Sequence, residues 1–74
     1  MSEHEYRVYQ FIIKYVKENL YPPTMAEICK ATGIKSKSTV SNVLAGLENL
    51  GYITVKLGNA RAIRLEGYCL VKAS

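Results

Sequence analysis

Residues Tyr21 to Gly51, YPPTMAEICKATGIKSKSTVSNVLAGLENLG, carry the signals of two helices joined by a tight turn. Thr24 and Glu27 have the spacing of a capping box, so a helix is expected to begin after Thr24. Gly33 predicts the end of this helix, since glycine accepts the left-handed conformation that closes many helices. Ser36 is the expected N-cap of the next helix, and Gly51 is its expected stop. This order is typical of a helix-turn-helix.

The second of these helices has two different sides. Apolar residues recur at the helical period and predict a buried stripe made of Val40, Val43, Leu44, Leu47 and Leu50. The opposite side carries short side chains and no acid, namely Ser38, Ser41, Asn42, Ala45 and Asn49. A plain solvent-facing side more often carries Glu and Lys. The small polar side therefore favours close approach to the edges of DNA bases.

A longer helix is expected before this motif, over Glu3 to Asn19, with Ser2 as its N-cap. Pro22 and Pro23 stop it, because proline supplies no amide donor. One apolar stripe is expected to face the core, namely Tyr9, Ile12, Ile13, Val16 and Leu20. A second stripe lies beside it, namely Val8, Phe11 and Tyr15. This second stripe either packs against the rest of the domain or forms a contact with a partner protein or a second copy.

Two short runs of alternating apolar residues, 52–57 and 61–65, flank the turn signal Gly58-Asn59 and predict a β-hairpin. A two-residue loop would turn one apolar set away from the core, whereas a three-residue loop over 58–60 lets both sets face it. The expected register therefore pairs Val55 with Ile63 and Ile53 with Leu65.

Three helices followed by a hairpin predict an α+β winged helix over residues 1–66. Residues 67–74 form an apolar tail that is expected to add a strand, to lie on the second stripe of the first helix, or to pair with another copy. Tyr68 and Val71 of this tail join Val8, Phe11 and Tyr15 as candidate dimer contacts.

The charge balance favours an anionic partner. Ten Lys and Arg oppose six Asp and Glu, for a net charge of +4. The basic residues between positions 30 and 64 meet a single acid, Glu48, and this clustering is the footprint expected of nucleic-acid binding. An unevenly charged but merely solvated surface is the alternative.

The composition argues against metal, membrane and catalytic roles. Cys29 and Cys69 are too far apart for a local metal site, and His4 is the single histidine. Cys29 is expected to be a small buried residue. No apolar run is long enough to span a bilayer, so a cytoplasmic protein is expected. No serine has a paired base, so we expect neither an enzyme nor a cofactor.

Several segments resemble the N-terminal DNA-binding domain of LexA-type repressors. They are YPPTMAEI at 21–28, STV at 38–40, LAGLENLGYI at 44–53 and RAIRL at 61–65. The resemblance runs from about Val8 to Leu65 and implies that the third helix enters the major groove while the wing holds the backbone. It implies a base-reading set of Ser36, Ser38, Thr39, Ser41 and Asn42. The expected phosphate-binding set is Thr24, Lys35, Lys37, Lys56, Arg61 and Arg64.

The chain departs from these repressors in one large respect. LexA repressors continue into a self-cleaving peptidase domain, and neither that domain nor an Ala-Gly cleavage site is found in this sequence. The alternatives are a free-standing small regulator and an excerpt of a longer protein, and the initial methionine and the apolar tail favour the former. We expect a homodimer on a palindromic DNA site. The alternative function is a protein-interaction module that modulates another regulator.

Overall fold

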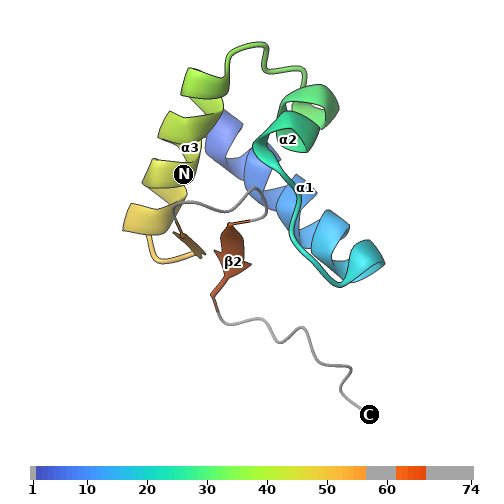
Figure 1. Ribbon diagram of the computed structural model, residues 1–74. Helices are drawn as coiled ribbons and strands as arrows, with labels where there is room; N and C mark the ends of the chain where they lie inside the picture. The colour runs from blue at the N-terminus through green and yellow to red at the C-terminus, as the bar shows by residue number, and fades with distance from the viewer. Residues whose placement is uncertain (1, 57–61, 67–74) are drawn as a thin grey trace.

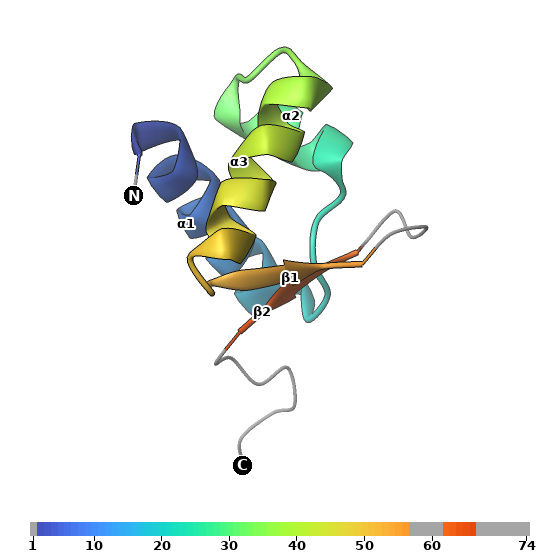
Figure 2. The same ribbon diagram turned by 90° about the vertical axis from the view of Figure 1, so that its left-hand side faces the viewer.

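The computed structural model describes residues 2–56 and 62–66, in which three helices precede two strands. The elements are α1 (Glu3–Asn19), α2 (Met25–Thr32), α3 (Lys37–Asn49), β1 (Ile53–Val55) and β2 (Ile63–Leu65). The helices pack together with β2 at one end of the bundle (Figure 1). Figure 2 shows both strands beneath the C-terminal end of α3. The arrangement confirms the expected α+β winged helix.

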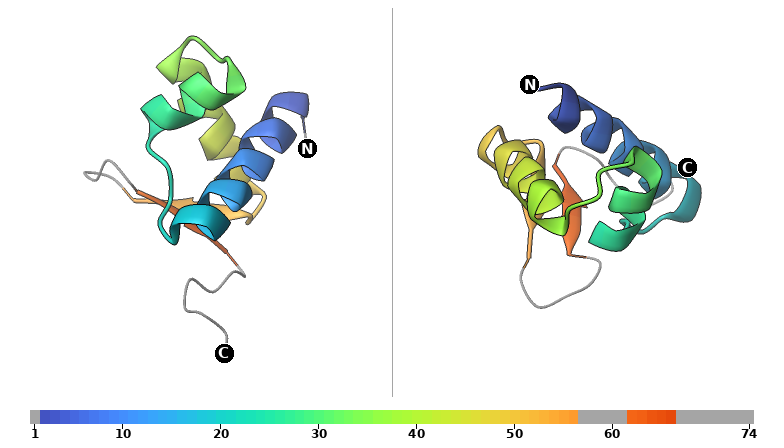
Figure 3. Two further views of the ribbon diagram at one scale, coloured as in Figure 1. Left: turned by 90° about the vertical axis from the view of Figure 1, so that its right-hand side faces the viewer. Right: turned by 90° about the horizontal axis from the view of Figure 1, so that it is seen from above.

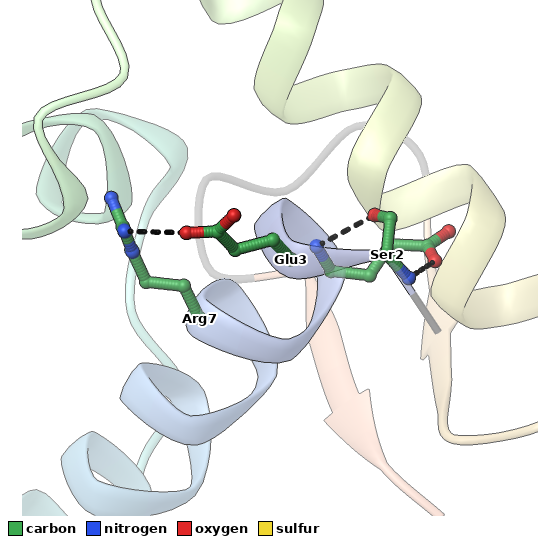
Figure 4. Close-up of polar contacts among 4 residues, drawn as sticks. Ser2, Glu3 and Arg7 are labelled. Atoms are coloured by element: carbon green, nitrogen blue, oxygen red, sulfur yellow. Dashed lines mark hydrogen bonds and ion pairs between the residues drawn. The ribbon is translucent and has the colours of Figure 1, made fainter.

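The start of α1 is fixed by a reciprocal cap. Ser2 Oγ accepts a hydrogen bond from Glu5 N at 3.1 Å, and Glu5 Oε1 accepts one from Ser2 N at 2.8 Å (Figure 4). The N-cap expected at Ser2 is thus confirmed, with Glu5 completing a capping box. Arg7 and Glu3 form an exposed ion pair at 3.4 Å, which contributes little to stability because water screens it.

The end of α1 corrects one expectation about the core. Leu20 is the C-cap, with a left-handed φ of 65°, and its amide donates to Val16 O at 2.8 Å. The change in backbone direction carries its side chain away from the helix stripe, so Leu20 is 54% exposed rather than buried. The expectation that Leu20 belongs to the core is therefore wrong.

Both ends of α2 are as expected. Thr24 Oγ1 accepts from Glu27 N at 3.2 Å, while Glu27 Oε1 accepts from Thr24 N at 2.8 Å. Gly33 closes the helix with φ 78°, and Ile34 is buried behind it. The local signals in this segment therefore fix the turn between α2 and α3.

Helix α3 begins at the expected N-cap, where Ser36 Oγ accepts from Thr39 N at 3.4 Å. It ends in a Schellman motif: Gly51 N donates to Glu48 O, and Tyr52 N donates to Leu47 O. Gly51 has the left-handed φ of 85° that this motif needs. Leu50 is the C-cap and is 54% exposed, so its expected place in the buried stripe is wrong. The other four members of that stripe are buried, namely Val40, Val43, Leu44 and Leu47.

The hydrophobic core lies where the three helices and the hairpin meet (Figure 3). From α1 it includes Val8, Ile12 and Val16. The exposed fraction of Val8 is 0%, so its assignment as a dimer contact is wrong, and packing within the domain accounts for it. Tyr9, Phe11 and Ile13 are half-buried against this core.

The hairpin has the expected register, with Ile53 opposite Leu65, Thr54 opposite Arg64 and Val55 opposite Ile63. Ile53, Ile63 and Leu65 are buried, which is why a slip by one residue is unfavourable. The loop expected at 58–60 lies outside the described residues.

Candidate DNA-binding surface

The outward side of α3 presents the small polar residues that the sequence placed there. All five are exposed, namely Ser38, Ser41, Asn42, Ala45 and Asn49. Among the described residues, the side chains of Ser38, Ser41 and Asn42 have no hydrogen-bond partner, so their donors and acceptors stay available to a ligand. Because the opposite side of α3 is buried, this surface has no part in the core.

The two remaining candidate base-reading residues have a different setting. Ser36 is exposed, but its hydroxyl oxygen already accepts the Thr39 amide as the helix cap. Thr39 is half-buried at the flank of α3. The geometry therefore brings Ser38, Ser41 and Asn42 together on one surface and leaves Ser36 and Thr39 at its border.

Exposed cations lie at the start of α3 and on the hairpin. Lys35 and Lys37 flank the start of α3, where the first turn has no acid and the helix dipole is positive. Lys56 follows β1, and Arg64 lies on the side of β2 opposite the buried Ile63 and Leu65. Within residues 2–56 and 62–66, none of these four cations forms an ion pair. Arg61 lies outside the described residues.

Thr24 is less suited to a phosphate than the lysines. Its hydroxyl oxygen caps α2, and the carboxylate of Glu27 lies at the same helix start. Glu27 Oε2 in turn accepts a hydrogen bond from Tyr15 Oη at 3.0 Å. The negative charge would repel a phosphate at this position.

The candidate dimer residues on α1 are largely occupied within the domain. The rings of Phe11 and Tyr15 lie 5.7 Å apart between centroids, and the Tyr15 ring lies 5.7 Å from that of Tyr21 in an edge-on arrangement. Tyr15 also donates to Glu27. Tyr68 and Val71 lie outside the described residues.

Two contacts at the hairpin were not expected from the sequence. Glu48 Oε2 accepts from Val55 N at 3.2 Å, which links α3 to β1. Thr54 Oγ1 donates to Glu66 Oε2 across the hairpin. The predicted register carries a signal for the Thr54–Glu66 pair, because it places the two residues diagonally on neighbouring strands. Glu48 and Val55 are seven residues apart on either side of a turn, and this spacing does not predict a hydrogen bond between them.

The described part of the chain contains no group of three or more His, Cys, Asp or Glu residues that would hold a metal ion. Cys29 is a free, half-buried thiol. Over the same residues, no helix has the length and apolar character needed to cross a membrane.

A three-helix bundle with an exposed polar third helix and a basic hairpin is a winged helix-turn-helix domain. The family model described as the LexA DNA binding domain matches residues 1–62, and the chain belongs to this family.

Similar proteins include three LexA repressors. That of Carboxydothermus hydrogenoformans is 42% identical over 65 residues, which cover 88% of this chain and 32% of the repressor. That of Caldicellulosiruptor saccharolyticus is 43% identical with the same two coverages, 88% and 32%. That of Moorella thermoacetica is 45% identical over 58 residues, covering 78% of this chain and 28% of the repressor. The chain thus spans about a third of the length of these relatives.

Proposed function

We propose that the chain is a sequence-specific double-stranded DNA-binding protein that represses transcription. In this proposal α3 lies in the major groove and the β1–β2 wing lies on the phosphate backbone. The observation that carries it is the exposed side of α3, which has short polar side chains without partners among the described residues. Family membership adds support for a role in binding rather than catalysis, in the cytoplasm where the DNA lies.

Base recognition falls to Ser38, Ser41 and Asn42. The Asn42 amide has a donor and an acceptor that match adenine N7 and N6 in two-point fashion. No arginine lies on this side of α3, so the common two-point contact to guanine is not made from it. Lys35 and Lys37 at the helix start are the groups that would reach a guanine edge instead.

Phosphate contacts fall to the cations around this surface, namely Lys35, Lys37, Lys56, Arg61 and Arg64. Neutralising about five phosphates gives a log-log salt slope of about −4 to −5 for the association constant. Thr24 adds at most a neutral hydroxyl, since Glu27 shares its helix start.

We infer that two copies bind a palindromic site, because one small domain with one recognition helix buries too little surface for tight and selective binding. With Val8 buried, the candidate contacts are the exposed edges of Phe11 and Tyr15 together with Tyr68 and Val71.

Selection of bound duplexes from a random pool tests this function. The expected result is a short half-site repeated with inverted symmetry, whose spacing reports the number of copies bound. A mobility-shift assay at low salt is the control for binding of any duplex. If no duplex is bound even there, DNA binding is refuted and a protein partner becomes the better explanation of the domain.

A further inference from the structure

Glu48 accepts one hydrogen bond within the turn that ends α3 and another from the wing. Its main-chain oxygen accepts Gly51 N at 3.0 Å, within the turn that joins α3 to β1. Its side-chain Oε2 accepts Val55 N at 3.2 Å, beyond that turn. Among the described residues, this is the side-chain hydrogen bond that joins α3 to the hairpin.

The Val55 amide faces the open edge of β1. Glu66 N donates to Tyr52 O, and Lys56 N donates to Ala62 O, on either side of the Thr54–Arg64 pair. In an antiparallel ladder, hydrogen-bonded pairs alternate with pairs whose amides point away from the partner strand. Since Lys56 and Ala62 form a hydrogen-bonded pair, the neighbouring Val55–Ile63 pair is of the second kind. Val55 N therefore points away from β2, and Glu48 supplies the acceptor that a third strand would otherwise supply.

The position of this bond matters because burial decreases along β1. Ile53 is 1% exposed, Val55 is half-buried and Lys56 is exposed. Opposite Val55, Ile63 of β2 is still buried at 5% exposed, so at this level the core holds the hairpin through β2 while β1 is becoming exposed. The Glu48 bond acts at this transition, directly before Lys56.

We propose that Glu48 is a positioning residue, which sets the angle between α3 and the wing so that both engage one DNA molecule. The inference rests on the proposed DNA-binding function. A carboxylate near a phosphate backbone is electrostatically unfavourable by itself, so a geometric role accounts for the single acid between positions 30 and 64. Its effect on DNA passes through Lys56 and Arg64 rather than through a contact of its own.

The test compares Glu48→Ala with Glu48→Gln on a selected duplex. Both substitutions remove the charge, but glutamine keeps an oxygen that accepts the Val55 amide. Since each phosphate contact contributes about 0.9 to the log-log salt slope, losing two wing contacts should reduce its magnitude by about 2 in Glu48→Ala. Glu48→Gln should keep the wild-type slope. In free protein, hydrogen exchange at Val55 N should speed up in Glu48→Ala alone.

Thermal melting and exchange of core amides check that both variants fold, which is expected because Glu48 is exposed and alanine favours a helix. A wild-type slope in Glu48→Ala, or the same change in both variants, overturns the positioning role. Absence of duplex binding by the wild-type chain refutes the proposed function itself, and the positioning role on DNA with it. The Val55 exchange rates distinguish these failures, because they report the Glu48 bond without DNA.

Discussion

Glu5 of α1 lies directly against Gly46 of α3, where the two helices approach each other. A Cβ atom at position 46 would overlap Glu5 Oε2 and come within 3.2 Å of Glu5 Cδ. The other carboxylate oxygen, Oε1, accepts the Ser2 amide that begins α1. A glycine inside α3 therefore leaves room for the side chain that caps a different helix.

This contact predicts an unusual response to Gly46→Ala. Alanine in a helix interior is normally more stable than glycine by about 1 kcal/mol. Here the new methyl group displaces the Glu5 carboxylate and weakens a cap worth about 1 kcal/mol, so the net change should be near zero. In a Glu5→Ala background the same substitution should recover the full gain of about 1 kcal/mol. Urea denaturation of the four proteins measures this coupling, and strictly additive changes would contradict the contact.

The substitutions Asn42→Ala and Arg64→Ala should have different effects on DNA binding, because Asn42 is proposed to read bases and Arg64 to bind phosphates. Loss of the Asn42 amide should reduce discrimination between selected and unrelated duplexes by about 1–3 kcal/mol. Loss of Arg64 should weaken all duplexes alike and lower the salt slope by about 1. Titrations of both variants at several salt concentrations measure the two effects. Equal loss on selected and random DNA for Asn42→Ala would refute its reading role.

The hydroxyl of Tyr15 should stabilise the domain through Glu27. Tyr15→Phe removes the 3.0 Å hydrogen bond to Glu27 Oε2 but keeps the ring, so the free energy of unfolding should fall by about 1–2 kcal/mol. Tyr6→Phe is the matched control, because Tyr6 is 59% exposed and should show no change. Both variants are compared by thermal melting. Equal melting temperatures for Tyr15→Phe and wild type would show that the bond contributes nothing.

Two apolar residues of α1 should differ from the roles that the sequence suggested for them, since Val8 is buried and Leu20 is exposed. Val8→Ala removes two buried methyl groups and should destabilise the domain by about 2 kcal/mol, without changing its oligomeric state. Leu20→Ala should change stability by less than about 0.5 kcal/mol, since the leucine is 54% exposed. Denaturation and sedimentation measure stability and assembly. A shift toward monomer in folded Val8→Ala would restore Val8 as a dimer contact.

Features with a local cause were predictable from the sequence. The caps at Ser2 and Thr24 are completed by Glu5 and Glu27 three residues later, a spacing that the sequence shows directly. Ser36 was predictable from its residue type directly before the apolar period of α3. The hairpin register was predictable because only one alignment buries both Ile53 and Ile63.

Features that depend on how elements meet were not predictable. Leu20 and Leu50 fit the apolar period of their helices, but each is a C-cap and is exposed. At Leu20 the left-handed backbone redirects the side chain, whereas Leu50 keeps right-handed helical angles and lies at the end of α3 beyond the residues that the core covers. Val8 belongs to the core because neighbouring elements cover a wider part of α1 than its first stripe. The Tyr15–Glu27 and Glu48–Val55 bonds join separate elements, so their geometry follows from packing angles that the sequence pattern does not specify.

The division of α3 into a buried side and an outward side has a consequence for evolution and for engineering. None of the five outward residues contributes to the core, so replacing them leaves the interior unchanged. A library randomised at these five positions should therefore consist mostly of folded proteins. If these residues read DNA as proposed, a new recognition sequence can be acquired by surface substitution alone, without a compensating change in the hydrophobic interior.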